Sequence, residues 1–216
     1  MIVKEGYPFI LGFLIIALGL RAVGSLLDYQ LIVNLSIIPA LLLLFCLNFF
    51  RNPKREIPSE DGIIVSPADG KIVKISQVED PNIGSGNIIS IFLNVFNVHI
   101  NRTPIDGTVK LVNYKKGKFL AAFNHSASDE NEQTNIHLES SAGLIKLKQI
   151  AGLLARRIRC YVDDGSQLKK GEKFGFIMFG SRVDIILPEH IDLMVKLGQK
   201  VKGGESIIGK YNEKKV

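Results

Sequence analysis

The first quarter of the chain is strongly apolar, whereas the remainder alternates between apolar and polar positions. Residues 29–50, YQLIVNLSIIPALLLLFCLNFF, contain no charge, and such a run is long enough to cross a hydrocarbon core of about 30 Å as a helix. Residues 6–27 form a second apolar segment that contains Arg21, whose charge is tolerated near a helix end but not at the bilayer centre. The pattern predicts a membrane-anchoring helical hairpin over residues 1–55, joined near Asp28, and leaves open whether residues 6–27 span the bilayer or lie in its interface.

A cleaved signal peptide is the competing interpretation of the N-terminus, because Ala22-Val23-Gly24 is similar to a small-residue cleavage site. Two features disfavour it. Lys4 is balanced by Glu5, so the N-terminal region lacks the net positive charge of a signal peptide, and a second apolar segment follows at once. The basic cluster within residues 51–55 predicts that the following part begins on the cytoplasmic side. We therefore expect a protein of the cell membrane with its main domain in the cytoplasm.

From residue 56 onward the apolar positions recur mostly with a period of two, which is typical of β-strands. The expected strands are short and are bounded by Gly, Pro, Asp or Asn. They comprise residues 62–65, 71–76, 87–93, 107–113, 144–150, 156–162, 173–178 and 183–187. The pattern predicts a mainly β domain with little helix over residues 56–216.

Two weak internal repeats refine the expected architecture. The motif that begins Pro67-Ala-Asp69-Gly70 recurs from Pro104, and residues 165–172 recur at residues 198–205. Asp-Gly after Pro is typical of tight turns, and this combination resembles the barrel-sandwich modules of biotinyl and lipoyl carriers. Such carriers need a modifiable lysine at a hairpin tip, whereas Gly180-Ser181 lies between the second pair of repeats. The sequence therefore favours a barrel-sandwich-like fold and disfavours a carrier role.

The net charge of +6 arises almost entirely after residue 50. Basic patches such as residues 115–118 and Arg156-Arg157 have no nucleic-acid-binding motif beside them. Attraction to anionic lipid is the better functional interpretation, and a solvated basic face is the simple alternative. The only cysteines, Cys46 and Cys160, exclude a disulfide framework and agree with a reducing compartment.

The sequence contains no G-x-S-x-G elbow, Walker loop or dinucleotide fingerprint, which argues against the corresponding hydrolases, kinases and dehydrogenases. No pair of histidines has metal-ligand spacing, so no metal site is predicted. The remaining candidates are Asp69, His99 and Ser181. Each also has a simple structural interpretation: a lone histidine at a strand end is more often structural, and Gly180-Ser181 in the apolar run FIMFGSRVDIILPEH fits a turn or bulge.

A Gly-Ser pair also permits chemistry on the chain itself. A serine hydroxyl can attack the preceding carbonyl and convert the amide into an ester, and glycine tolerates the strained backbone that this requires. Beta-elimination of the ester then cuts the chain, and hydrolysis of the dehydroalanine that remains releases ammonia and leaves a pyruvoyl group. The ketone of this group can form a Schiff base with an amine and act as an electron sink.

Four motifs make the sequence similar to a known family. They are Pro67-Ala-Asp69-Gly70, FNVHINRTPIDG at residues 96–107, QIAGLLARRI at residues 149–158 and FGSRVD at residues 179–184. Their order resembles that of the phosphatidylserine decarboxylase proenzymes in the short bacterial and archaeal form, over essentially residues 58–208. Arg182 after the Gly-Ser pair and Phe96 before the histidine differ from the long form, and the short form shares both features.

The resemblance implies a proenzyme that cleaves itself between Gly180 and Ser181 into a large chain of residues 1–180 and a small chain of residues 181–216. Ser181 would become the covalent pyruvoyl cofactor, His99 would take the proton from Ser181, and Asp69 would orient His99. His99 would then act as a proton donor in the conversion of phosphatidylserine to phosphatidylethanolamine, a carboxy-lyase reaction of phospholipid biosynthesis. A substrate that stays in the bilayer would explain the membrane anchor.

Several alternatives remain open. Basic residues such as Arg102, Lys115 or Lys118 are candidates to hold the substrate's phosphate and carboxylate, and the stretch ending at Gln133 departs from the family pattern that we expected there. The chain could instead be a pyruvoyl decarboxylase of another amino-lipid or amino acid, or a non-catalytic membrane-tethered β-sandwich scaffold. The sequence does not determine whether the chain is a monomer or a homo-oligomer. It also gives no acyl-chain preference.

Overall fold

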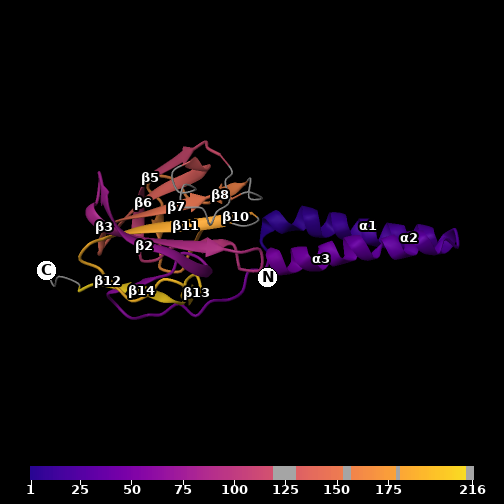
Figure 1. Cartoon of the computed structure of the whole chain (residues 1–216), viewed down its shortest axis with the longest axis horizontal. Helices are drawn as coiled ribbons and strands as arrows, with labels where there is room; N and C mark the ends of the chain where they lie inside the picture. The colour runs from indigo at the N-terminus through magenta and orange to yellow at the C-terminus, as the bar shows by residue number, and fades with distance from the viewer. Residues whose placement is uncertain (119–129, 153–156, 179–180, 213–216) are drawn as a thin grey trace. The chain divides into compact units, whose positions relative to one another are not determined.

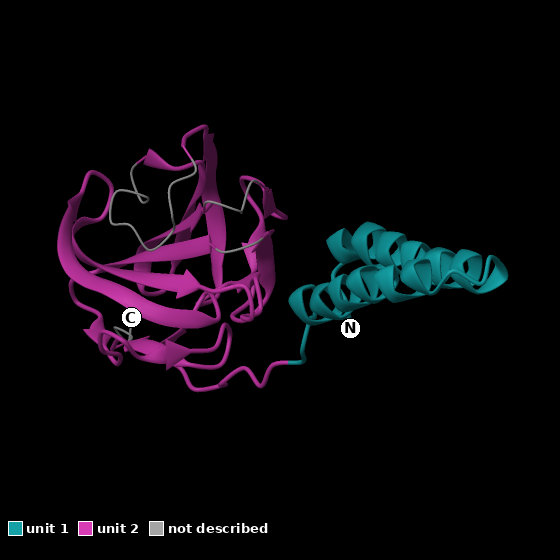
Figure 2. Ribbon diagram, turned by 45° about the vertical axis from the view of Figure 1, so that its right-hand side comes forward, with its two compact units in different colours: residues 1–54 teal, residues 55–216 magenta. Residues whose placement is uncertain are grey.

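The computed structural model describes residues 1–118, 130–152, 157–178 and 181–212. The chain divides into two compact units, residues 1–54 and residues 55–216 (Figure 2). The first unit is helical and the second consists mainly of β-strands (Figure 1). A mainly β domain preceded by a helical hairpin, as the sequence predicts, is therefore confirmed.

The helical unit is a hairpin. A single turn of 3-10 helix, η1 (Lys4–Gly6), leads into α1 (Tyr7–Leu26), and the chain returns as α2 (Gln30–Leu35) and α3 (Ile37–Phe49). Asp28 in the connecting turn has a φ of 51°, which a short polar side chain tolerates. The break at Ser36 follows from Pro39, because proline has no N–H to donate to the carbonyl of residue 35.

The open end of the hairpin is tied together by backbone contacts. Val3 N–H donates to Phe50 O at 2.9 Å, and Asn52 N–H donates to Met1 O at 2.7 Å. Near the turn, Gly24 allows close packing, because a Cβ there would lie 2.7 Å from Val33 N. The segments Lys4–Leu26 and Gln30–Phe49 are long and apolar enough to cross a membrane, which supports membrane association. Their sidedness stays a prediction.

The β unit contains an eight-stranded antiparallel sheet that is curled (Figures 1 and 2). The strand order is β13-β2-β3-β11-β7-β6-β5-β9. These strands are β2 (Gly70–Asp80), β3 (Gly84–Leu93), β5 (Gly107–Lys115), β6 (Gln133–Ser140), β7 (Gly143–Ile150), β9 (Gln167–Leu168), β11 (Ser181–Pro188) and β13 (Lys200–Val201). Strand β11 pairs with β3 on one side and β7 on the other, so it lies inside the sheet.

Two three-stranded sheets complete the unit. One joins β1 (Ile63–Val65), β14 (Ile207–Lys210) and β12 (Asp192–Leu193), and the other joins β4 (Ile100–Arg102), β10 (Lys173–Ile177) and β8 (Ile158–Cys160). A single apolar core connects the three sheets. It includes Ile91 and Val183 from the large sheet, Phe174 and Ile177 from β10, and Ile208 from β14.

All eight predicted strands coincide with observed ones, although residue 156 of the sixth lies outside the described residues. Six further strands, β4, β6, β9, β12, β13 and β14, were not predicted. Strand β6, QTNIHLES, has apolar residues only at Ile136 and Leu138, so its periodicity is too weak to indicate a strand. It is held by its partners β5 and β7 on both sides, which is a tertiary effect.

Candidate active site

Ser181 is the first residue of β11 and lies directly opposite Leu93, the last residue of β3. Side chains alternate along a strand, so Ser181 faces the same side as Val183 and Ile185, which belong to the apolar core. Ser181 is fully buried, and its Oγ has no hydrogen-bond partner among the described residues. A buried hydroxyl of this kind is unusual and requires an explanation. Gly180, the other half of the predicted cleavage site, lies outside the described residues.

His99 lies just before β4 and is also fully buried. Its backbone carbonyl accepts a hydrogen bond from Ile177 N–H at 3.2 Å, which places it beside the end of β10, four residues before Ser181 in sequence. Its Nδ1 lies 3.0 Å from the carbonyl oxygen of Asn97. Because a carbonyl can only accept, Nδ1 carries the proton and Nε2 is the acceptor nitrogen of the ring. This is the tautomer that a base toward a serine hydroxyl requires.

Asp69 immediately precedes β2, at the same end of the strands of the large sheet as Ser181. The next residue, Gly70, packs so tightly against β3 that a Cβ there would lie 2.3 Å from Phe92 O. Phe92 precedes Leu93, and Leu93 pairs with Ser181. The ends of three neighbouring strands, β2, β3 and β11, thus bring Asp69 to the vicinity of the serine. Asp69 and Ser181 thus lie at the same end of the large sheet, whereas His99 precedes β4 in the neighbouring sheet, and a triad of the three residues stays a prediction.

The carboxylate of Asp69 is bound mainly by Arg55. Arg55 Nη2 donates to both carboxylate oxygens at 2.9 Å, and Gly203 N–H donates to Oδ1 at 2.8 Å. Both side chains are largely buried, with 6% of Arg55 and 13% of Asp69 exposed. The ring of His99 donates from Nδ1 to Asn97 O, and the orienting role of Asp69 stays a prediction.

Comparisons with known proteins identify the family of the chain. The sequence matches the family model of phosphatidylserine decarboxylase over residues 42–209. The chain belongs to the phosphatidylserine decarboxylase family. It is 41% identical over 212 residues to the phosphatidylserine decarboxylase proenzyme of Chlorobium limicola, which covers 98% of this chain and 100% of the relative. It is 44% identical over 210 residues to the proenzyme of that name from Citrifermentans bemidjiense, covering 96% and 95%.

The candidate headgroup residues of this phosphatidylserine decarboxylase family member have different surroundings. Arg102 is buried, and its Nη1 donates to Gly171 O at 2.9 Å. Burial and the nearby charge of Arg55 lower the pKa of Arg102. Lys118 is exposed and forms an ion pair with Glu130 at 2.7 Å, which raises its pKa. Lys115 is also exposed, and no described contact places any of the three beside Ser181.

Sequence reasoning missed a buried polar network on the opposite face of β11. Arg182 Nε donates to Asp184 Oδ1 at 2.7 Å, and Arg182 Nη2 donates to Ser90 Oγ at 2.5 Å. Arg182 and Asp184 are fully buried. A buried ion pair is destabilising unless both charges are well bonded. The sequence signal for this network was the presence of two opposite charges, two residues apart, in an otherwise apolar strand. The network links the first residues of β11 to the neighbouring strand β3.

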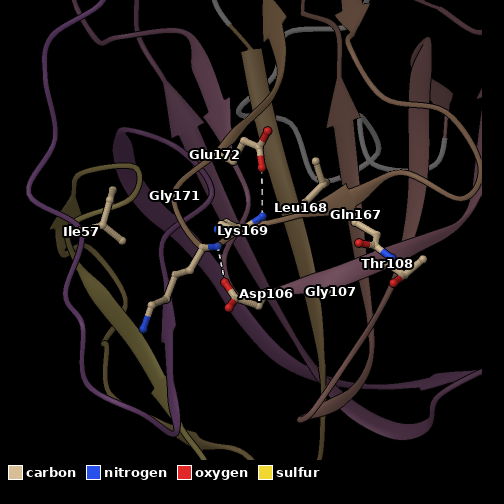
Figure 3. Close-up of a pocket in the computed structure, with 10 residues that line it drawn as sticks. Ile57, Asp106, Gly107, Thr108, Gln167, Leu168, Lys169, Gly171 and Glu172 are labelled. Carbon is tan, nitrogen blue, oxygen red and sulfur yellow. Dashed lines mark hydrogen bonds between the residues drawn. The ribbon is translucent and has the colours of Figure 1, made fainter.

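The structure also contains an open pocket of about 810 Å³ beside the turn that precedes β10 (Figure 3). Its lining includes Ile57, Asp106 and Lys170. Lys170 N–H donates to Asp106 Oδ1, and Lys169 N–H donates to Glu172 Oε2. Asp69, His99 and Ser181 are not among the described residues that line it. Most residues that line the pocket belong to the turn repeats that the sequence shows.

Proposed function

We propose that the chain is a proenzyme that cuts itself between Gly180 and Ser181 and then decarboxylates phosphatidylserine to phosphatidylethanolamine. Membership of the family supports the reaction, a carboxy-lyase reaction. The observation that carries the residue assignment is the buried Oγ of Ser181, which has no hydrogen-bond partner among the described residues, and buried His99 lies beside the end of β10, four residues before Ser181 in sequence. A buried hydroxyl without a partner loses hydrogen bonds to water and is retained where it has a task.

In the proposed self-cleavage, Nε2 of His99 accepts the proton from Ser181 Oγ, and Oγ attacks the carbonyl carbon of Gly180. The amide becomes an ester, and the amino group of Ser181 is released. Loss of the Cα proton of Ser181 and breakage of its Cβ–Oγ bond leave a carboxylate on Gly180 and dehydroalanine at position 181. Water then replaces the nitrogen, which leaves as ammonia. His99 is suited to the first proton transfer because Asn97 O holds the proton on Nδ1.

The surroundings of Ser181 fit a pyruvoyl group, because the small buried side chain lies among core residues and no described contact occupies its Oγ. The group would supply a ketone that binds the substrate amine and withdraws electrons as carbon dioxide leaves. His99 would supply a proton from the adjacent strand end. The buried position excludes bulk water from the reacting atoms.

The small chain of residues 181–216 would stay bound after cleavage. Strand β11 pairs with β3 from Ser181 to Pro188 and with β7 from Arg182 to Ile186, and β13 pairs with β2. Its apolar side chains also belong to the common core. The two chains would therefore remain one folded unit, anchored to the membrane by the hairpin and facing the cytoplasm.

Intact mass of the purified protein tests the proposal directly. The wild type should give two chains, with the smaller one lighter than a serine-started peptide of residues 181–216 by the elements of ammonia. Ser181→Ala should give one uncut, inactive chain, and Ser85→Ala, at an exposed serine of β3, should be cut normally. A single uncut mass in the wild type would favour the scaffold without catalysis.

Activity on phosphatidylserine beside a panel of free amino acids and other amino-lipids decides the substrate. Release of carbon dioxide from phosphatidylserine alone is the expected result. Release from free amino acids at a similar rate would instead support the pyruvoyl decarboxylase of another substrate class.

A further inference from the structure

Two buried amide side chains connect the large sheet to the β4-β10-β8 sheet. Gln149 of β7 donates through Nε2 to Asn101 Oδ1 of β4 at 2.8 Å, and both residues are fully buried. The neighbouring Gly175 makes room for the amide, because a Cβ there would lie 2.3 Å from Gln149 Nε2. A larger residue at position 175 would therefore displace the amide of Gln149.

The amide pair is incompletely bonded. Asn101 Nδ2 and Gln149 Oε1 are buried and have no hydrogen-bond partner in the part of the chain that the structure describes. Rotating both amide groups by 180° would exchange their roles but would again leave one donor and one acceptor. Buried polar atoms normally have partners, because burial without one costs the hydrogen bonds made to water. The pair thus leaves one buried donor and one buried acceptor available to a polar group.

The amide pair lies on the same side as the proposed reacting residues. Gln149 pairs with Val183, so it is the diagonal neighbour of Ser181 on the same face of the sheet, with Cα atoms about 7–8 Å apart. Asn101 lies two residues after His99 along an extended segment that pairs with β10, and side chains two residues apart share a face. Ser181 Oγ is itself a third buried atom without a described partner.

We propose that Asn101 and Gln149 bind the amino-acid end of phosphatidylserine. This inference rests on the proposed function and names the subsite in which that substrate is held. The amide donor binds the substrate carboxylate, and the amide oxygen accepts a hydrogen bond from the substrate nitrogen. One donor and one acceptor on two hydrogen-bonded side chains match the carboxylate and amine of an α-amino acid.

The neutrality of the amide pair suits the reaction. A cation bound to the carboxylate would stabilise the charge that is lost as carbon dioxide leaves, and such binding favours the substrate over the transition state. A neutral amide orients the carboxylate with a weaker bond. Binding in a buried site also strengthens this single contact relative to water.

The sharpest test is Asn101→Asp, which keeps the oxygen that accepts from Gln149 and replaces only the unpartnered donor by an oxygen. It should self-cleave, and its KM for phosphatidylserine in mixed micelles should rise about tenfold to a hundredfold with a much smaller change in kcat. Asn101→Ser, which retains a neutral donor, should recover part of the loss. The matched control is Asn113→Asp, at an exposed position of β5, and it should leave KM unchanged.

Each other outcome overturns the inference. An unchanged KM in Asn101→Asp would mean that solvent alone occupies the site. Loss of self-cleavage in both Asn101→Asp and Asn101→Ser would assign the Asn101 donor to processing. A lowered melting temperature in both variants, with a normal KM in the folded fraction, would assign this donor to stability. Failure of the proposed function has a different signature, a wild type that releases no carbon dioxide from phosphatidylserine.

Discussion

Arg55 binds both carboxylate oxygens of Asp69 through a single nitrogen, at 2.9 Å each. Arg55 also lies 3.6 Å from Glu205, so it joins two acidic residues of the β unit. Arg55 follows the basic end of the apolar hairpin, whereas Asp69 immediately precedes β2, which β3 separates from β11 and its proposed reacting serine. The ion pair thus determines where the Asp69 carboxylate points, and it has consequences for stability and for processing.

The first prediction concerns stability. Removing one partner of a buried ion pair costs about 3–5 kcal/mol, because the other charge stays buried and unpaired. Arg55→Met and Asp69→Asn should each lower the melting temperature of the detergent-solubilised chain by about 6–20 °C. The double variant should lose clearly less than the sum of the two single losses.

Lys110→Met is the matched control, because Lys110 pairs with Glu139 at the surface with 53% and 59% of the side chains exposed. Exposed pairs contribute at most about 1 kcal/mol. Simple additivity of the Arg55 and Asp69 effects would show that the two side chains do not interact in solution.

The second prediction separates Asp69 from His99 in self-cleavage. Where a carboxylate alone orients a catalytic histidine, its conversion to asparagine costs about ten-thousandfold in rate. Here Asn97 O already holds the Nδ1 proton of His99. Asp69→Asn should therefore slow cleavage by no more than about a hundredfold, which is an electrostatic effect, whereas His99→Ala should abolish it.

The measurement is the fraction of cut chain against time, followed by denaturing gel electrophoresis during cell-free synthesis. Complete loss of cleavage in Asp69→Asn, with a fold that still melts cooperatively, would show that the carboxylate turns to His99 in the reacting state and would refute the assignment to Asn97.

Much of this molecule can be predicted from the sequence because its signals are local. The charge-free run at residues 29–50 and the period of two after residue 56 depend only on neighbouring residues, and they predict the second arm of the hairpin and eight of the described strands. A triad of Asp69, His99 and Ser181 is predicted only through the family resemblance. No local pattern shows that the starts of β2 and β11 lie beside the end of β3 in one sheet.

The remaining contacts could not be predicted because they join distant segments. Arg55 binds Asp69 and Glu205, and Gln149 binds Asn101 across two sheets. Each partner taken alone is an ordinary polar residue in the sequence. Only the register of the strands, set by the pairing of buried faces, determines which of these side chains meet.

The third prediction uses Gly70, which brings β2 against β3. A Cβ at this position would lie 2.3 Å from Phe92 O and 2.8 Å from a methyl carbon of Ile91, and backbone atoms inside a sheet cannot easily move away. Gly70→Ala should therefore displace Asp69, destabilise the chain by more than about 1 kcal/mol and slow self-cleavage. Gly19→Ala in α1, where nothing lies within 4 Å of the added atom, should be cleaved at the wild-type rate. Equal cleavage rates in both variants would contradict the predicted link between this packing and the site.

The fourth prediction concerns acid stability at Asp80. Burial raises the pKa of this carboxyl, but hydrogen bonds from Lys146 Nζ and from the N–H groups of Asn82 and Ile83 lower it more, so that the net pKa lies below its usual range. A carboxyl with a depressed folded pKa adds stability that is fully present above its unfolded value of about 3.9 and is lost as the pH falls through the folded value.

The wild type should therefore lose melting temperature as the pH falls below about 4, where the unfolded chain begins to bind the proton first. Asp80→Asn should start from a lower melting temperature at neutral pH and should lose less on acidification, because it cannot take up that proton. Asp192→Asn, at an exposed position of β12, should follow the wild-type curve. Parallel curves for the wild type and Asp80→Asn would show that the contact with Lys146 does not contribute to stability.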